Sequence, residues 1–364
     1  MALCPGRIWE RRQKRSSVAE FLAMAASLLV AVASMVNGQA LVPALVVFGD
    51  SAVDVGNNNH ILTLVKSNFP PYGRDFPRRI PTGRFCNGKL AVDFTAETLG
   101  FEVYPPAYLG ENARGKNLLI GANFASASSG YLESTALLYH TVSLNQQLSY
   151  YKEYQQKVRR ITRNKTRSDA IFSEGIHLLS TGSSDFLQNY YINPLYKVLH
   201  TPAQFADSLV DSFTSFVQFG SAENRGRLAS TLGCLPASIT LYAPSGSSDC
   251  VERFNHDAIL FNKKLETAAR TLRRKLSGLK LVVFDIYKPV LDLIRNPSGN
   301  GFYESRRGCC GTGTVETSLL CNSRSPGTCR NATGYVFWDS VHPSEATNRV
   351  LADALITQGI DLIT

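Results

Sequence analysis

The most regular feature of the sequence is a set of short, continuously apolar segments that end in small or polar residues. The first runs from Ala44 to Phe48 and is followed by Gly49-Asp50-Ser51. Similar segments occur at residues 176–179 and 279–284. A strand that is buried on both faces has this pattern, because neither of its sides faces water. These segments therefore predict a parallel sheet that is covered by helices.

Between and after these segments, apolar residues recur at the spacing of an amphipathic helix. The clearest patterns span residues 144–163, 202–219 and 257–276. A C-terminal helix is predicted to start at Ser344 and to stop at Gly359. Strands that alternate with helices are typical of a doubly wound α/β domain. Functional residues in such folds gather beyond the carboxyl ends of the strands, so the residues that follow each strand are the first to examine.

The chain begins with a basic stretch and one long apolar segment. Residues 21–36 form an apolar run that follows the basic residues of the first 16 positions and precedes Gly38-Gln39-Ala40. This order predicts a secretory signal peptide at residues 1–40 and a single domain at residues 41–364. The alternative is an anchor retained in the membrane, but the run is shorter than the roughly 20 residues that span a bilayer. We therefore expect a secreted, extracellular protein that is not an integral membrane protein.

Cysteine usage agrees with export to an oxidising compartment. Four cysteines near the C-terminus have no C-x-x-C spacing and no histidine at a ligand spacing, which favours disulfides over a zinc site. They are Cys309, Cys310, Cys321 and Cys329, and the sequence leaves three connectivities open for them. A Cys234–Cys250 bridge would close a separate small loop and leave Cys86 unpaired. Two sequons, at Asn164 and Asn331, predict N-glycosylation at the surface.

The formal charge of +9 does not by itself indicate a nucleic-acid-binding protein. Beyond the predicted signal peptide the basic residues form no dense tract, as on an ordinary solvated surface. The sequence lacks G-x-G-x-x-G, and its G-x4-G-K segments at 83–89 and 110–116 lack the Ser or Thr that follows in a phosphate-binding loop. We therefore expect no nucleic-acid partner and no nucleotide site, and we expect a monomer.

Three residues from opposite ends of the mature chain could provide nucleophilic catalysis. Ser51 follows the first predicted strand, while Asp339 and His342 are three residues apart near the C-terminus. A serine hydroxyl is a poor nucleophile at neutral pH, so it needs a base and a group that orients the base. The spacing lets the carboxylate accept the imidazole Nδ1–H and leaves Nε2 for the serine. On spacing alone, a turn serine and a surface Asp–His pair remain the alternative interpretation.

Five blocks of the sequence, in order, resemble those of the plant GDSL esterase/lipases, members of the SGNH hydrolase superfamily. These blocks lie at residues 48–58, 82–85, 123–126, 182–186 and 339–343. The resemblance covers nearly all of the mature chain and implies a three-layer αβα sandwich around a five-stranded parallel sheet. It also implies that Ser51 is the nucleophile, that His342 is the general base and then the acid, and that Asp339 orients it. The resemblance implies no metal and no organic cofactor.

Two residues depart from the oxyanion hole that this resemblance implies. In the family the donors are the backbone N–H of the nucleophile, here Ser51, the backbone N–H of a Gly and the side chain of an Asn. Here Ser128 stands at the expected Gly and Ser184 at the expected Asn. A left-handed backbone costs a serine about 1–2 kcal/mol, and a hydroxyl is shorter than a carboxamide. Because losing one oxyanion donor typically lowers turnover by ~10²–10³, we expect weakened catalysis.

A second departure concerns the sheet. Before Leu232-Gly233-Cys234 the family carries an apolar strand, whereas residues 220–231 of this chain hold few apolar side chains. Too few remain for a strand that is buried on both faces. We therefore expect either an incomplete sheet or a degraded, poorly paired strand in this region.

These observations predict a secreted serine ester hydrolase. Its substrates would be small-molecule or polymeric carboxylic esters of lipid or cell-wall type, cleaved through an acyl-enzyme. One alternative is a catalytically impaired member of the family that binds ester ligands without efficient turnover. Another is an acyltransferase that uses the same three residues, and the site sequence does not separate it from a hydrolase.

Overall fold

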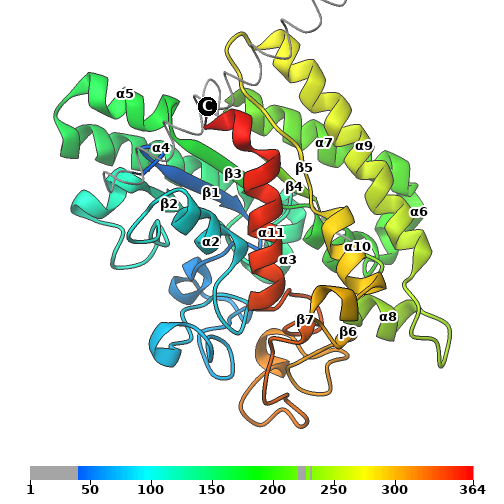
Figure 1. The fold of residues 1–364 in the computed structure, drawn as a ribbon. Helices are drawn as coiled ribbons and strands as arrows, with labels where there is room; N and C mark the ends of the chain where they lie inside the picture. The colour runs from blue at the N-terminus through cyan, green and yellow to red at the C-terminus, as the bar shows by residue number, and fades with distance from the viewer. Residues whose placement is uncertain (1–39, 220–226, 230–231, 364) are drawn as a thin grey trace, which may run out of the picture.

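A parallel sheet lies at the centre of the protein. The computed structural model describes residues 40–219, 227–229 and 232–363, so almost all of the predicted signal peptide lies outside the described residues. Five strands pair in parallel in the order β2-β1-β3-β4-β5 (Figure 1). They are β1 (Leu45–Gly49), β2 (Gly121–Asn123), β3 (Ile176–Ser180), β4 (Arg227–Ala229) and β5 (Phe284–Asp285). The predicted parallel α/β fold is confirmed.

Helices cover both faces of the sheet, and β1 shows how the sequence directs this arrangement. Val46 and Phe48 pack into the core cluster on one face, together with apolar residues of three helices, α4 (Leu144–Thr162), α7 (Pro202–Phe219) and α9 (Glu252–Lys275). Leu45 and Val47 pack into the cluster on the other face, with residues of three other helices. These are α2 (Ala91–Thr98), α10 (Tyr287–Arg295) and α11 (Glu345–Gln358), whose places relative to the sheet can be followed in Figure 1. Successive side chains of a strand point to opposite faces, so a continuously apolar segment fills both cores. The result is the predicted three-layer αβα arrangement.

The long helices agree closely with the apolar periodicity. The helices of the structure are α2 (Ala91–Thr98), α3 (Glu133–Tyr139), α4 (Leu144–Thr162), α5 (Lys165–Ser173), α6 (Pro194–Leu199), α7 (Pro202–Phe219), α8 (Pro236–Tyr242), α9 (Glu252–Lys275), α10 (Tyr287–Arg295) and α11 (Glu345–Gln358). Helix α9 begins five residues before the predicted start, because the buried Phe254 extends its apolar face. The start of α11 is confirmed, since the Ser344 side chain accepts the Thr347 amide.

The second half of the sheet is paired over a shorter length than the first. The expectation of an incomplete sheet is wrong, because β4 lies between β3 and β5 and completes the five-strand order. The expectation of a poorly paired strand is confirmed, since β4 has two register pairs with each neighbour. The strand predicted at 279–284 is also shorter, because β4 offers partners only to Phe284 and Asp285. Residues 220–226 and 230–231 lie outside the described residues.

Three disulfides form among the described cysteines. Cys234 pairs with Cys250, and Cys86 is free and buried, as predicted. Of the three connectivities left open for the C-terminal four, the structure has Cys309–Cys329 and Cys310–Cys321. These two bridges tie the chain between β6 (Glu304–Gly308) and β7 (Tyr335–Phe337), which form a separate two-stranded parallel sheet.

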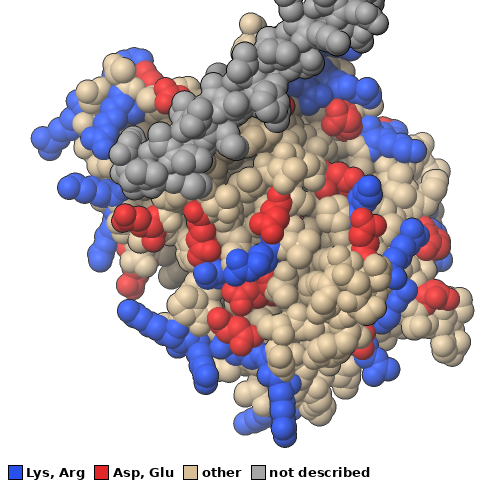
Figure 2. Space-filling view, in the orientation of Figure 1, with Lys and Arg blue, Asp and Glu red and all other residues tan. Residues whose placement is uncertain are grey.

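The visible surface carries charges of both signs. Basic and acidic side chains are interspersed over the face drawn in Figure 2, with no broad patch of one sign there. This is the distribution expected of an ordinary solvated surface. Among the residues that the structure describes, no helix has both the length and the apolarity to cross a membrane.

The end of β1 needs a residue without a side chain. Gly49 has a φ of 142°, and a Cβ built there would lie 1.9 Å from the Ser180 carbonyl oxygen. The two residues are register partners, and the next residue, Asp50, donates its amide to the same oxygen at 2.9 Å. This close approach of β1 and β3 fixes the path of the chain just before Ser51.

We expect Gly49→Ala to destabilise the protein by about 3 kcal/mol or more, because backbone atoms on β3 cannot yield to the added methyl group. Thermal unfolding under non-reducing conditions checks this. Gly278→Ala is the matched control, since Gly278 also has a positive φ, of 82°, but nothing lies within 4 Å of its added Cβ. Equal effects of the two substitutions would contradict the proposed steric cause.

Candidate active site

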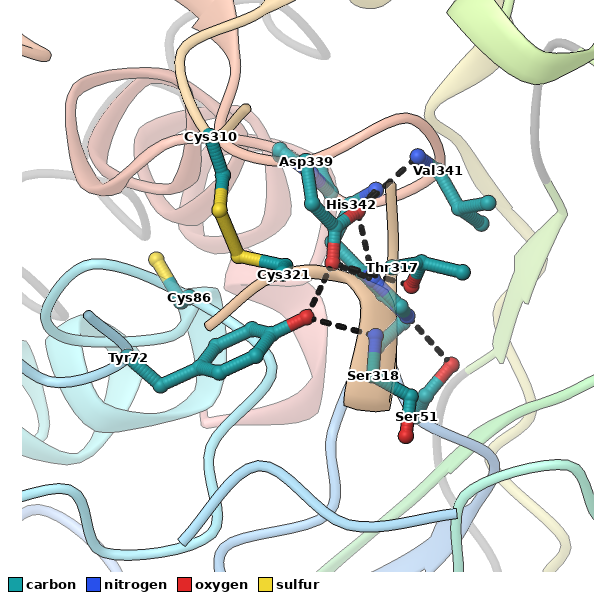
Figure 3. A network of polar contacts seen from close by, with 12 residues as sticks. Ser51, Tyr72, Cys86, Cys310, Thr317, Ser318, Cys321, Asp339, Val341 and His342 are labelled. Atoms are coloured by element: carbon teal, nitrogen blue, oxygen red, sulfur yellow. Dashed lines mark hydrogen bonds and ion pairs between the residues drawn. A yellow bond between two sulfur atoms is a disulfide. The ribbon is translucent and has the colours of Figure 1, made fainter. Parts of the chain in front are cut away.

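The structure brings Ser51, Asp339 and His342 into one row (Figure 3). Ser51 Oγ lies 2.8 Å from His342 Nε2, although the two residues are 291 positions apart in the sequence. His342 Nδ1 lies 2.8 Å and 2.9 Å from the two carboxylate oxygens of Asp339. Ser51 lies two residues after the end of β1, and the other two residues lie in the loop between β7 and α11. All three contacts have hydrogen-bonding distances.

The Asp339–His342 loop is closed by the carboxylate itself. Asp339 Oδ1 accepts the backbone amides of Val341 at 2.9 Å and His342 at 2.7 Å. The same carboxylate therefore shapes the turn and meets the imidazole that the turn presents. Asp339 has no exposed surface, and burial alone would raise its pKa. The charge of His342 and the hydrogen bonds from His342 and the two amides outweigh burial and hold the pKa of Asp339 below its usual range.

Two side chains that the sequence did not single out complete the surroundings of this carboxylate. Tyr72 donates its hydroxyl to Asp339 Oδ2 at 2.8 Å, and Thr317 donates to the same oxygen at 3.0 Å (Figure 3). The Tyr72 hydroxyl in turn accepts the Ser318 amide at 2.8 Å. The segment that carries Thr317 and Ser318 is tied to the site by the Cys310–Cys321 bridge. Tyr72 was not identified from the sequence because it is 267 residues away from Asp339, the residue to which it donates.

An aromatic ring packs against the imidazole. The centroids of the Phe85 and His342 rings are 5.0 Å apart, and Phe85 is almost fully buried. The neighbouring Arg84 forms a buried ion pair with Asp93, with nitrogen–oxygen distances of 2.7 Å and 2.8 Å. Asp93 also accepts the Leu90 amide at the start of α2. The sequence block at 82–85 thus anchors the wall of the site to α2.

Ser128 has the left-handed backbone whose cost was considered from the sequence. Its φ is 61°, in the left-handed region, and its side chain is buried. The preceding residue, Ala127, donates its amide to Asp54 Oδ2 at 3.1 Å and accepts the Asn58 side chain at 3.2 Å. Ser128 borders the same groove as Ser51. The polar residues that follow Ser51 therefore hold the Ser128 loop beside it.

Ser184 lies four residues after the end of β3. It is buried and lies immediately before a π-helical turn, Asp185–Tyr190. It borders a small hollow that Ser51 and His342 also border. Each of the two predicted oxyanion residues thus borders a space that Ser51 and His342 also border.

Four buried aspartates lie around the site, and their surroundings shift the pKa upward in three of them and downward in the fourth. Burial raises the pKa of Asp50 to about 7, and that of Asp54 and Asp185 to about 6, against the opposing hydrogen bonds that each accepts. The pKa of Asp339 is lowered instead. Environments that separate the pKa values of neighbouring carboxyl groups are typical of sites in which those groups have different tasks. A lasting negative charge is thus favoured beside the imidazole.

The arrangement can support proton transfer from a serine hydroxyl, since Oγ and Nε2 are within hydrogen-bond reach and the other ring nitrogen is held by a carboxylate. Among the residues that the structure describes, no group of three or more His, Cys, Asp and Glu side chains could hold a metal ion. Asn164 and Asn331 are both exposed, and N-glycosylation at them stays a prediction.

Comparisons with known proteins agree with this geometry. The model of the GDSL-like lipase/acylhydrolase family matches residues 45–355. The GDSL esterase/lipase At3g53100 of Arabidopsis thaliana is 59% identical over 328 residues, which are 89% of this chain and 93% of that protein. The GDSL esterase/lipase APG of the same plant is 57% identical over 89% of this chain and 92% of its own length. The chain therefore belongs to the GDSL-like lipase/acylhydrolase family of carboxylic ester hydrolases.

Proposed function

We propose that this protein cleaves carboxylic esters of lipid or cell-wall type by a serine acyl-enzyme mechanism. The observation that carries the proposal is the row of Ser51, His342 and Asp339, with 2.8 Å between Ser51 Oγ and His342 Nε2. Ser51 is the nucleophile, His342 is the general base and then the acid, and Asp339 holds the imidazole in the correct tautomer.

In the first half of the reaction, Ser51 Oγ attacks the ester carbonyl carbon while its proton passes to His342 Nε2. The tetrahedral intermediate then collapses, and the leaving alkoxide takes that proton from His342 and departs as the alcohol. In the second half, His342 accepts a proton from water as the water oxygen attacks the acyl-Ser51 ester. Collapse releases the carboxylic acid, and the proton returns to Ser51 Oγ. An alcohol in place of this water would make the protein an acyltransferase.

The negative oxygen of the tetrahedral intermediate needs preorganised donors. We assign this task to the backbone amides of Ser51 and Ser128 and to the side chain of Ser184. Support comes from the two serines, each of which borders a space shared with Ser51 and His342, and from the left-handed backbone of Ser128. The hydroxyl of Ser184 is a shorter donor than a carboxamide, so we expect a weak third contact.

We also propose that the protein is exported and acts in the cell wall or apoplast. The three disulfides support an oxidising compartment, because such bridges persist there and are rare in the cytosol. The signal peptide predicted at residues 1–40 and the exposed sequons at Asn164 and Asn331 agree with this route.

A fluorophosphonate that labels activated serines tests the proposed nucleophile. We expect stoichiometric labelling at Ser51, identified by peptide mass, together with hydrolysis of p-nitrophenyl butyrate. Ser51→Ala should abolish both, and Ser149→Ala, which changes an exposed serine on α4, should alter neither. Absence of labelling in folded protein would reject the hydrolase and favour a protein that binds esters without turnover.

Ser184→Asn tests the oxyanion assignment. Restoring a carboxamide at this position should raise kcat on p-nitrophenyl butyrate about tenfold or more, because a complete oxyanion hole stabilises the transition state. Ser183→Asn is the matched control, since Ser183 borders the same hollow and the substitution adds the same group one residue away. An unchanged kcat in Ser184→Asn, or an equal gain in the control, would remove Ser184 from the oxyanion hole.

Tyr72→Phe tests whether the buried hydroxyl positions Asp339. Loss of a hydrogen bond to a buried carboxylate should lower kcat on p-nitrophenyl butyrate about tenfold, with little change in KM, and should also lower the free energy of unfolding by about 2 kcal/mol. Tyr108→Phe is the control, because Tyr108 is also buried and donates its hydroxyl to a carboxylate, Glu153. If both variants lose stability but keep kcat, Tyr72 has a structural role alone.

A further inference from the structure

Two separate spaces meet at the triad. One is a small hollow that extends from Ser51 toward α10 and α11, in which the centre of a water molecule has about 90 Å³ of free space. The other is a larger groove that extends toward Tyr139 and Tyr242, in which the same measure is about 310 Å³. We name them the inner hollow and the outer groove. Six residues border both spaces: Ser51, Leu187, Gln188, Leu235, Val341 and His342.

We propose that the inner hollow binds the acyl chain of the substrate as an unbranched chain of about eight carbons, while the alcohol part occupies the outer groove. This inference rests on the proposed acyl-enzyme mechanism and adds the substrate class that its site accepts.

The chemistry of the inner hollow changes along its length. Its end near Ser51 is polar, with the buried Thr181 hydroxyl and the Gln188 side-chain oxygen both lacking a hydrogen-bond partner in the described structure. Away from Ser51 the walls are apolar, with Val290 from α10 and Leu351 and Leu355 from α11. A ligand with one polar end and one apolar tail matches this order.

One polar side chain does reach the apolar part, but it is already engaged. The Asn348 amide nitrogen donates to Cys86 Sγ at 3.4 Å and to the Pro343 carbonyl at 3.5 Å. The amide is therefore directed into the protein, and Asn348 contributes no free donor to a chain in the hollow. The inner part of the hollow thus selects against polar groups.

The length of the acyl chain follows from the helix that forms one wall. His342 and Pro343 precede α11, so the helix starts near the reacting atoms and runs away from them. The bordering residues from Asn348 to Leu355 span seven helical steps, about 10 Å. An extended polypeptide spans about 3.6 Å per residue over three backbone bonds. An extended acyl chain likewise advances roughly 1.2 Å per bond. About eight bonds therefore fit along this wall.

The order of chemical events decides which space holds the acyl group. After the first half of the reaction the alcohol must leave and water must enter, while the acyl group stays bonded to Ser51. The larger outer groove allows this exchange, and the smaller inner hollow retains a group that does not have to move. A branched or polymeric alcohol also needs the larger space.

A series of p-nitrophenyl esters, from acetate through butyrate and octanoate to dodecanoate, tests the inference on the purified protein. With the unmodified chain, kcat/KM should rise by roughly fourfold per added methylene while the methylenes gain apolar contacts, and should fall again at dodecanoate. A flat profile in a protein that hydrolyses the esters and is labelled at Ser51 would overturn the inner-hollow assignment and leave the proposed function intact.

Substitutions at Val290 make the test specific to the inner hollow. Val290→Phe should lower the octanoate-to-acetate ratio of kcat/KM at least tenfold, because the ring occupies the space of several methylenes. Val290→Ala, which removes two methyl groups and should fold normally, should move the optimum toward longer chains. Val198→Phe on the exposed face of α6 is the control, and its ratio should match that of the unmodified chain.

Three outcomes are distinguishable. Opposite shifts in the two Val290 variants support the inference. Parallel losses on all esters, or no change of the optimum in Val290→Ala, overturn it. Failure of the unmodified chain to hydrolyse any ester or to react with the fluorophosphonate overturns the proposed function, and the inference with it.

Discussion

A buried negative charge at Asp339 is the constraint on which the site depends. A carboxylate without exposed surface is costly unless it is paired and hydrogen-bonded. Two kinds of partner satisfy it here. The imidazole and two amides come from its own turn, and the Tyr72 and Thr317 hydroxyls come from other segments of the chain. Satisfying this one charge therefore fixes the N-terminal loops, the disulfide-bridged segment and the β7–α11 loop relative to one another, and it places Nε2 of His342 at Ser51.

The other side of the site is held by carboxyl groups of a different kind. Asp54 accepts backbone amides from Gly56, Asn57 and Ala127, and Asp185 accepts the Tyr131 amide and other donors of the neighbouring loop. Burial raises the pKa of both residues against these accepted hydrogen bonds, and the bonds themselves hold the loops in shape. The buried aspartates of the site thus have two tasks. Asp54 and Asp185 accept hydrogen bonds that hold loops in shape, whereas Asp339 provides the negative charge beside the imidazole.

Local sequence patterns predicted the parts of the structure that depend on residues close to one another in the sequence. The segment before Ser51 is apolar on both faces, so a buried strand followed by a reactive position could be expected from it. The three-residue spacing of Asp339 and His342 likewise indicated a pair within one turn. The short strands β4 and β5 could not be delimited, because strand length there is set by what the neighbouring strand offers and not by the residues themselves.

Contacts between distant segments account for most of what the sequence did not reveal. Tyr72 follows two prolines, and nothing nearby indicates that its hydroxyl is directed at a carboxylate 267 residues away. The pairing of the four C-terminal cysteines was open for the same reason. The two spaces beside the triad are also invisible in the sequence, since each is bordered by side chains from several elements.

The two serines at the proposed oxyanion positions differ in what their substitution changes. At Ser128 the proposed donor is a backbone amide, which survives any substitution that the left-handed backbone tolerates, and the hydrogen bonds of Ala127 to Asp54 and Asn58 hold that backbone in place. The cost of a serine there, about 1–2 kcal/mol, lowers the free energy of unfolding. At Ser184 the proposed donor is the side chain itself, so under this proposal the substitution shortens the reach of the donor and raises the free energy of the transition state. Under this proposal, a substitution at position 128 changes mainly the free energy of unfolding, whereas one at position 184 changes mainly the free energy of the transition state. The fold of the family can therefore be kept while catalysis changes.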